Sequence, residues 1–302
     1  MAGRQPGYLR LADSGELERR AALLQERLQS CVICPHHCRV NRLANERGFC
    51  RAGARAVISS YGPHYGEEAP LVGQGGSGTI FFCYCTLRCI FCQNYEISHY
   101  GLGEEASPSE IARMMLSLQK KGCHNINLVS PTHYIPQIVL GLSLAVQEGL
   151  TLPLVYNTGG YDDLDTLKLL EGIVDIYMPD LKFGDNDKAR KYTKAANYFD
   201  LAAAAVKEMQ RQVGTLKLDE RQIAYRGLLI RHLVLPHNLA ATDRVLEFIA
   251  AELPGETAVN IMAQYHPAHQ ADQFPELAAR ITGQEYAGAV RYARELGLSN
   301  LL

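Results

Sequence analysis

The stretch that decides the fold is TIFFCYCTLRCIFCQN (79–94), in which a short apolar run ends at a dense group of cysteines. Cys85, Cys89 and Cys92 are separated by three and then two residues, and Cys83 lies two positions before the first of them. TIFF has the length and composition of a buried strand, so the cysteines are expected at its carboxyl end. Ligands gather at that end of parallel strands. Burial alone gives no reason for such crowding, and the spacing indicates a metal site.

Three cysteines suit one kind of metal site better than others. Three thiolates hold three irons of a [4Fe–4S] cube and leave the fourth iron open, whereas a closed cluster takes four cysteines. Structural zinc sites are four-coordinate and usually consist of two paired half-sites. Cys83 as a fourth ligand would form a cramped C-x-C chelate with Cys85. The spacing therefore favours an iron–sulfur site with one open iron.

A second group of cysteines precedes the first, in CVICPHHCRVNRLANERGFC (31–50), with the spacing C-x2-C-x3-C-x11-C. Its four thiols are Cys31, Cys34, Cys38 and Cys50. Four cysteines suit either a closed [4Fe–4S] cluster or an all-thiolate zinc site, and His36 or His37 is an alternative for one ligand. The centre would relay electrons or contact substrate, or it would only fold an extension too small for its own core.

Composition and charge narrow the class of protein. Of the 302 residues, 47% are hydrophobic and 21% are charged, and the formal net charge is −2 at pH 7. This is ordinary globular composition without the basic excess of a nucleic-acid-binding protein. The N-terminal 20 residues show no signal peptide, and no run approaches the ~18 apolar residues of a membrane span. We expect a cytoplasmic protein with no membrane or nucleic-acid partner, in which clustered cysteines indicate metal binding more than disulfides.

The chain as a whole predicts alternating strands and helices. Strand candidates occur at 79–82, 125–130, 152–157, 173–178, 228–235 and 257–263. Helices are expected at 14–30, 107–122, 136–148, 162–170, 198–213 and 241–252. In the clearest of them Ser107 is the N-cap, Pro108 is the first helical residue and Glu110 completes a capping box. This alternation indicates βαβ units and a parallel sheet, either open or closed into a barrel.

The cysteine spacing, with an aromatic residue before the last cysteine, resembles the signature of the radical S-adenosylmethionine (SAM) superfamily. Further segments extend the resemblance to the pyruvate formate-lyase-activating-enzyme-like subgroup, over most of residues 31–265. They are GSGTIFFCYCTLRCIFCQNYEIS, NINLVSPTHY, PLVYNTGGYD, VDIYMPDLKF and LIRHLVLPH. The resemblance implies an α/β fold: a partial (β/α)6 radical SAM barrel over 77–302, with a small Cys-rich, metal-binding extension over 1–76.

The resemblance also implies an activity. In this superfamily SAM chelates the open iron, and a reduced cluster delivers one electron to the sulfonium. The 5′-deoxyadenosyl radical so formed abstracts hydrogen from substrate, which implies a [4Fe–4S] cluster, SAM and a flavodoxin- or ferredoxin-type electron donor. The implied substrate is a glycine Cα–H in a glycyl-radical enzyme. The alternatives are radical modification of another protein, peptide or small molecule, and a non-catalytic iron–sulfur electron carrier.

Matching positions supply the expected cofactor-binding residues, which are Phe91, Ser130, Asn157, Thr158, Asp180, Lys182 and Arg231. Phe91 would pack beside the adenine. Ser130 stands where the superfamily usually has Gly-Gly-Glu, and Asn157 replaces the aspartate of the activating enzymes, which removes one negative charge. Outside the resemblance, Glu67 and Glu68 are expected to form a solvated acidic turn.

Overall fold

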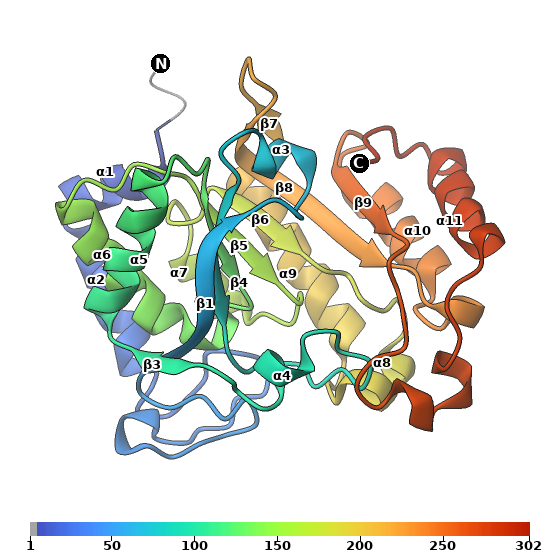
Figure 1. The fold of residues 1–302 in the computed structure, drawn as a ribbon, viewed down its shortest axis with the longest axis horizontal. Helices are drawn as coiled ribbons and strands as arrows, with labels where there is room; N and C mark the ends of the chain where they lie inside the picture. The colour runs from blue at the N-terminus through green and yellow to red at the C-terminus, as the bar shows by residue number, and fades with distance from the viewer. Residues whose placement is uncertain (1–4) are drawn as a thin grey trace.

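The structure, a computed structural model, describes residues 5–302, and a sheet of nine strands runs through its centre (Figure 1). The first four residues, part of the stretch in which no signal peptide is expected, lie outside the described residues. The strands are β1 (Ala56–His64), β2 (Ser77–Phe82), β3 (Glu104–Ala106), β4 (Ile126–Val129), β5 (Leu154–Thr158), β6 (Ile176–Pro179), β7 (Lys217–Leu218), β8 (Ala224–Leu233) and β9 (Ala258–Met262). No helix within residues 5–302 is long and apolar enough to cross a membrane.

The six predicted strands are all present and run parallel, in the order β2-β4-β5-β6-β8-β9. Each is therefore the spatial neighbour of the next predicted strand in the chain. The sheet is open, because β1 and β3 extend it with antiparallel pairing beyond β2. The short β7 pairs antiparallel with the start of β8. This topology confirms the predicted partial (β/α)6 barrel.

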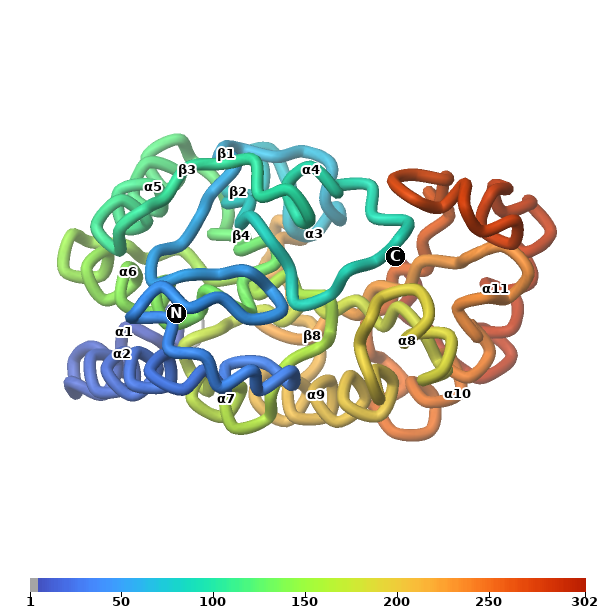
Figure 2. Tube along the Cα trace, turned by 90° about the horizontal axis from the view of Figure 1, so that it is seen from below, coloured from blue at the N-terminus to red at the C-terminus, as the bar shows by residue number. Residues whose placement is uncertain are grey.

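The helices that connect the parallel strands follow one another around the outside of the sheet (Figure 2). They are α5 (Pro108–Lys120), α6 (Ile135–Gln147), α7 (Leu164–Leu169), α9 (Tyr198–Val213) and α10 (Thr242–Glu252). The capping box predicted at Ser107 and Glu110 is formed, with both reciprocal hydrogen bonds present. Shorter or unpredicted helices are α3 (Ala69–Val72), α4 (Tyr95–Ser98), α8 (Asn186–Thr193) and α11 (Gly283–Glu295).

The N-terminal segment shares the core of the barrel. Helix α1 (Gly7–Asp13) precedes α2 (Glu16–Glu26), which is shorter than the predicted 14–30 helix and packs against α6 and α7. Leu17 and Leu24 of α2 are fully buried in the cluster that also contains the barrel residues. The predicted boundary after residue 76 falls between β1 and β2, which are paired. The division of the chain at that point stays a prediction.

Both cysteine segments lie near the carboxyl ends of the parallel strands. Strand β2 ends at Phe82, and the loop that contains Cys85, Cys89 and Cys92 follows directly and leads into α4. The loops of residues 31–55 lie at the same end of the sheet (Figure 1). The fold thus places every cysteine of the two groups on the side where a parallel sheet offers its strand ends to ligands.

Candidate functional site

The Cys85–Cys92 loop is held in place by backbone hydrogen bonds. Arg88 N–H donates to Thr193 O and Ile90 N–H donates to Tyr192 O, each at 2.9 Å. Within the loop, Leu87 N–H donates to Cys85 Sγ at 3.3 Å. Burial raises the pKa of the Cys85 thiol to about 11. The loop thus orients thiols that a metal would have to deprotonate on binding.

A cavity of about 160 Å³ opens between this loop and the strand ends. Nine of the residues that the sequence singles out line it: Cys85, Cys89, Cys92, Ser130, Asn157, Thr158, Asp180, Lys182 and Arg231. A neighbouring cavity of about 250 Å³ shares Cys89, Cys92, Asp180, Lys182 and Arg231 and adds Phe91. The structure therefore brings these nine residues and Phe91 to one hollow at the carboxyl ends of β2, β4, β5, β6 and β8.

Two cations and one carboxylate form the charged centre of this hollow. Arg231 Nε donates to Asp180 Oδ1 at 2.8 Å, and Lys182 Nζ donates to Asp180 Oδ2 at 2.5 Å. Arg231 Nη2 also donates to Asn157 Oδ1 at 2.7 Å. Burial would raise the pKa of Asp180, but the two neighbouring cations outweigh it and hold that pKa below its ordinary value. Asp180 is therefore an anion in the folded protein.

The acidic turn at Glu67 and Glu68 is less exposed than expected. The sequence predicts a solvated turn for Glu67 and Glu68, but Glu67 reaches into the site and lies 3.3 Å from Arg231 Nη1, with 9% of its side chain exposed. Burial raises its pKa, and Arg231 acts against that shift. Glu68 accepts a hydrogen bond of 2.9 Å from Asn260 Nδ2. The turn is thus packed against β8 and β9, on residues that lie far away in the sequence, and Glu67 meets Arg231 behind the cavities.

A buried carboxylate that the sequence does not single out anchors the strand ends. Asp162 accepts hydrogen bonds from the hydroxyls of Thr132 and Thr158, both at 2.7 Å, and from Tyr156 OH at 2.8 Å. Burial raises its pKa above the ordinary value. The network joins Thr158 on β5 to the turn after β4, where Ser130 adopts a left-handed conformation with φ 56°. This network fixes the backbone where the usual Gly-Gly-Glu is missing.

Aromatic packing holds Phe91 at the edge of the second cavity. Its ring lies 6.0 Å from that of Tyr265 and 6.1 Å from that of Phe183, both at steep angles. Only 6% of Phe91 is exposed. The side chain therefore has one face against the core and one side toward the cavity that it lines.

The four N-terminal cysteines line neither cavity, but their segment packs directly on the Cys85–Cys92 loop. His36 Nε2 donates to Thr86 O at 2.8 Å, and Arg88 Nη2 donates to Phe49 O at 3.0 Å. The rings of His36 and Phe49 stack at 3.9 Å. Within residues 5–302, no group of three or more His, Cys, Asp and Glu side chains is arranged to hold a single metal ion.

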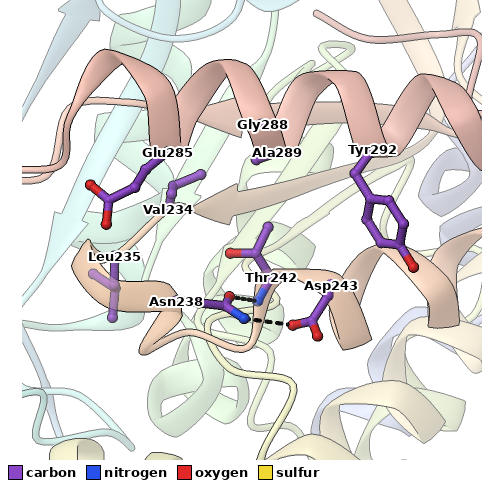
Figure 3. Close-up of a pocket in the computed structure, with 9 residues that line it drawn as sticks. All are labelled: Val234, Leu235, Asn238, Thr242, Asp243, Glu285, Gly288, Ala289 and Tyr292. Atoms are coloured by element: carbon purple, nitrogen blue, oxygen red, sulfur yellow. Dashed lines mark hydrogen bonds between the residues drawn. The ribbon is translucent and has the colours of Figure 1, made fainter.

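The two remaining cysteines lie apart from both groups. Cys83 Sγ faces Leu102 O at 3.4 Å, and Cys83 lines neither cavity. Cys123 is buried in the hydrophobic core. A further cavity of about 260 Å³ lies between α10 and α11, away from every predicted site residue (Figure 3). Its polar groups already have partners: Asn238 Nδ2 donates to Asp243 Oδ1 at 2.9 Å, and Tyr292 OH donates to Glu247 Oε1 at 2.6 Å.

Comparisons with known proteins agree with this geometry. The model of the radical SAM superfamily matches residues 79–217. Uncharacterized protein MJ0674 of Methanocaldococcus jannaschii is 32% identical over 292 residues, which span 93% of this chain and 79% of that protein. Uncharacterized protein MJ0808 of the same organism is 25% identical over 282 residues, 85% of this chain and 77% of that protein. Neither name attributes an activity.

Two solved structures are more distant. HydG, a maturase of the [FeFe]-hydrogenase, is 12% identical with a TM-score of 0.48, over 72% of this chain and 49% of that one. TYW1 with a lysine-pyruvate adduct is 11% identical with a TM-score of 0.43, over 72% of this chain and 73% of that one. At these scores neither likeness bears on activity.

An open parallel barrel with three cysteines behind its first parallel strand defines a class, the iron–sulfur enzymes that cleave SAM. The chain belongs to the radical SAM superfamily. Membership brings a [4Fe–4S] cluster and SAM as cofactors. The side chains present fit both groups, because three free thiols and a set of paired charges face one cavity.

Proposed function

We propose that Cys85, Cys89 and Cys92 hold the [4Fe–4S] cluster and that SAM binds in the adjoining hollow. The observation that carries this proposal is the cavity that these three thiols share with six predicted strand-end residues. When bound and reduced, the cluster supplies one electron that cleaves SAM, and the resulting 5′-deoxyadenosyl radical takes a hydrogen atom from substrate. The protein binds and orients SAM and the substrate, and it excludes water from the site.

The residues of the hollow suit the parts of SAM. Lys182 and Arg231 offer positive charge to the methionyl carboxylate, and Asp180 offers an acceptor to the amino group or the ribose hydroxyls. The ring of Phe91 offers an apolar face to the adenine. Ser130 and Thr158, at the ends of neighbouring strands, offer hydroxyl groups. Each of these roles is a proposal for one side chain at a stated place.

We propose a glycine Cα–H of a partner enzyme as the substrate, in line with the resemblance to glycyl-radical activating enzymes. Radical modification of another protein, a peptide or a small molecule is the alternative. A flavodoxin- or ferredoxin-type protein would supply the electron. The enzyme would work in the reducing cytoplasm, where thiols such as the free cysteines of this chain stay unpaired.

We further propose that Cys31, Cys34, Cys38 and Cys50 hold a second metal centre, either a closed [4Fe–4S] cluster or a zinc ion. None of the four lines either cavity, which favours an electron-relay or structural role over contact with substrate. The packing of His36 on Thr86 O would couple such a centre mechanically to the SAM-cluster loop.

Formation of 5′-deoxyadenosine from SAM tests the proposal, after anaerobic cluster reconstitution and reduction. Wild type should form the product and Cys85→Ala should not, whereas Cys123→Ala, which removes a core thiol outside both groups, should retain activity. Product from Cys85→Ala would refute the ligand assignment. Wild type that holds its cluster but forms no product, even with candidate glycyl-radical enzymes added, would support the electron-carrier alternative.

A further inference from the structure

Arg42 is an arginine buried without an acidic partner. It lies in η1 (Arg42–Ala44), between Cys38 and Cys50, and is 1% exposed. Its Nε and Nη2 donate to Gly53 O at 3.1 and 2.9 Å, and its Nη1 donates to His133 O at 2.7 Å. Among residues 5–302 no carboxylate hydrogen-bonds the guanidinium. Burial of an uncompensated cation costs several kcal/mol, so another source of negative charge is expected nearby.

The guanidinium has two further neighbours, a sulfur atom and the ring of Tyr134, whose centroid lies 5.8 Å from Arg42 Cζ. Arg42 Nη1 lies 3.9 Å from Cys31 Sγ, and its positive charge also acts on Cys50. Glu46, an acidic residue of the same segment, is turned away and accepts a hydrogen bond of 2.7 Å from Asn41 N–H. Among the described contacts of the guanidinium, Cys31 Sγ is the group that becomes an anion when it binds a metal.

Two sulfurs of that group meet a hydrogen-bond donor. Phe49 N–H donates to Cys38 Sγ at 3.4 Å, and Arg42 Nη1 lies 3.9 Å from Cys31 Sγ. Gly48 packs closely on Cys38, since a Cβ added to Gly48 would lie 2.7 Å from Cys38 Sγ. Donors directed at these two sulfurs suit thiolate ligands, because hydrogen bonds to cluster sulfurs stabilise their negative charge.

We infer that Arg42 is the buried counter-charge of an anionic [4Fe–4S] centre held by Cys31, Cys34, Cys38 and Cys50; this rests on the second metal centre proposed above and commits it to iron. A cube held by four thiolates carries net negative charge, which grows by one when the centre accepts an electron. A guanidinium buried beside it stabilises the reduced form more than the oxidised form, since little solvent screens the interaction. Arg42 thus raises the reduction potential of this centre.

The contacts of Arg42 also reach the other cysteine loop. Its partner His133 is 1% exposed and donates through Nε2 to Cys83 O at 2.8 Å, two residues before Cys85. Through Arg42 and His133, the N-terminal centre is therefore linked by hydrogen bonds to the residues that precede the SAM-cluster loop.

The test uses the full-length chain with Cys85, Cys89 and Cys92 replaced by alanine, so that only the N-terminal centre remains. Metal analysis should find about four irons per chain and no zinc. Redox titration followed by electron paramagnetic resonance then compares Arg42→Gln, which is neutral but still donates to carbonyls, with Arg42→Lys, which keeps the charge. Arg42→Gln should lower the reduction equilibrium constant about tenfold, or about 59 mV for one electron. Arg42→Lys should stay near the parent.

Arg88→Met is the matched control, because Arg88 is half-buried, contacts the same segment at Phe49 O and also acts on Cys50. Solvent screens it, so its loss should shift the potential much less than the loss of Arg42. Zinc in place of iron would overturn the iron–sulfur assignment. Iron with an unchanged potential in Arg42→Gln would overturn the role of Arg42, and so would equal shifts in Arg42→Gln and Arg88→Met. None of these results bears on the proposed cleavage of SAM, which the 5′-deoxyadenosine assay on intact protein tests separately.

Discussion

The guanidinium of Arg231 on β8 donates a hydrogen bond of 2.8 Å to the carboxylate of Asp180, which follows β6 51 residues earlier in the chain. The two side chains are 16% and 13% exposed, so water screens the pair little. Lys182 and Glu67 complete a chain of alternating charges through Asp180 and Arg231. Opposite charges in contact are what allow these four groups to be held together in a largely buried place.

Asp180→Asn should therefore destabilise the fold. The substitution leaves Arg231 and Lys182 facing each other with less compensation, and removal of one partner from a buried pair costs about 3 kcal/mol. Denaturant unfolding of the two proteins at pH 7 measures the difference. Asp165→Asn, which removes the partner of Lys168 from an ion pair on the surface, should stay close to wild type. Equal stability of Asp180→Asn and Asp165→Asn would show that the site pair is not effectively buried.

Lys182→Met should weaken SAM binding about tenfold, because it removes one positive charge from the proposed carboxylate site. Equilibrium dialysis of reconstituted protein with labelled SAM measures the affinity. Lys191→Met is the control, since Lys191 also pairs with a carboxylate, Glu276 at 2.6 Å, but lines neither cavity. An unchanged affinity in Lys182→Met would show that another residue binds the carboxylate of SAM.

Asp162→Ala should cost about 3 kcal/mol of stability, because the hydroxyls of Thr132, Tyr156 and Thr158 lose their shared acceptor. Asp162→Asn keeps one carbonyl oxygen in place and should cost about 1 kcal/mol. The midpoints of urea unfolding compare the two variants. If both cost the same, shape rather than hydrogen bonding determines the contribution of this network.

His232 should make the stability depend on pH. It is fully buried between Leu181 O and Thr242 Oγ1, and burial lowers its pKa from 6.5 to about 4. Below pH 6.5, His232 therefore binds a proton in the unfolded chain. In the native state it stays neutral until the pH falls to about 4. The stabilising contribution is full above pH 6.5 and is lost as the pH falls toward 4, by about 1.4 kcal/mol per pH unit.

His232→Gln tests this relation, because its amide can replace both hydrogen bonds and does not titrate. Unfolding free energies are measured for both proteins at pH 7.5 and pH 5.5. Wild type should lose about 1.4 kcal/mol more than the variant between these values. Parallel losses would mean that His232 accepts a proton in the folded state.

Gly48→Ala should displace Cys38, since the new Cβ would lie 2.7 Å from both Cβ and Sγ of that cysteine. Iron analysis of reconstituted protein should then show a loss of about half the metal, with the SAM cluster retained. Gly53→Ala is the matched control in the same segment, because its nearest neighbour would be Arg47 Nη2 at 3.6 Å. Full iron content in both variants would separate Cys38 from the metal centre.

Local patterns in the sequence predicted much of the fold. Each of the six parallel strands is an apolar run bounded by turn residues, and α9 (Tyr198–Val213) begins and ends where its pattern predicts. Strand β1 was missed because its residues alternate poorly and include Gly62 and Pro63, so its pairing depends on β2 rather than on its own pattern. Helix α11 was missed as well, although Thr282 and Glu285 form a capping box.

What the sequence alone determined is the chemistry: two groups of cysteines at ligand spacings, and polar residues that follow apolar strands. Ligand spacing and strand ends are local, so a few neighbouring residues carry them. Only the tertiary structure decided which charged side chains are buried and which distant residues they contact. Glu67 meets Arg231 across 164 residues, and Arg42 is buried beside Cys31 with His133 O as a partner 91 residues away. Such pairs depend on how the sheet and the N-terminal segment pack, and no local pattern of residues encodes that packing.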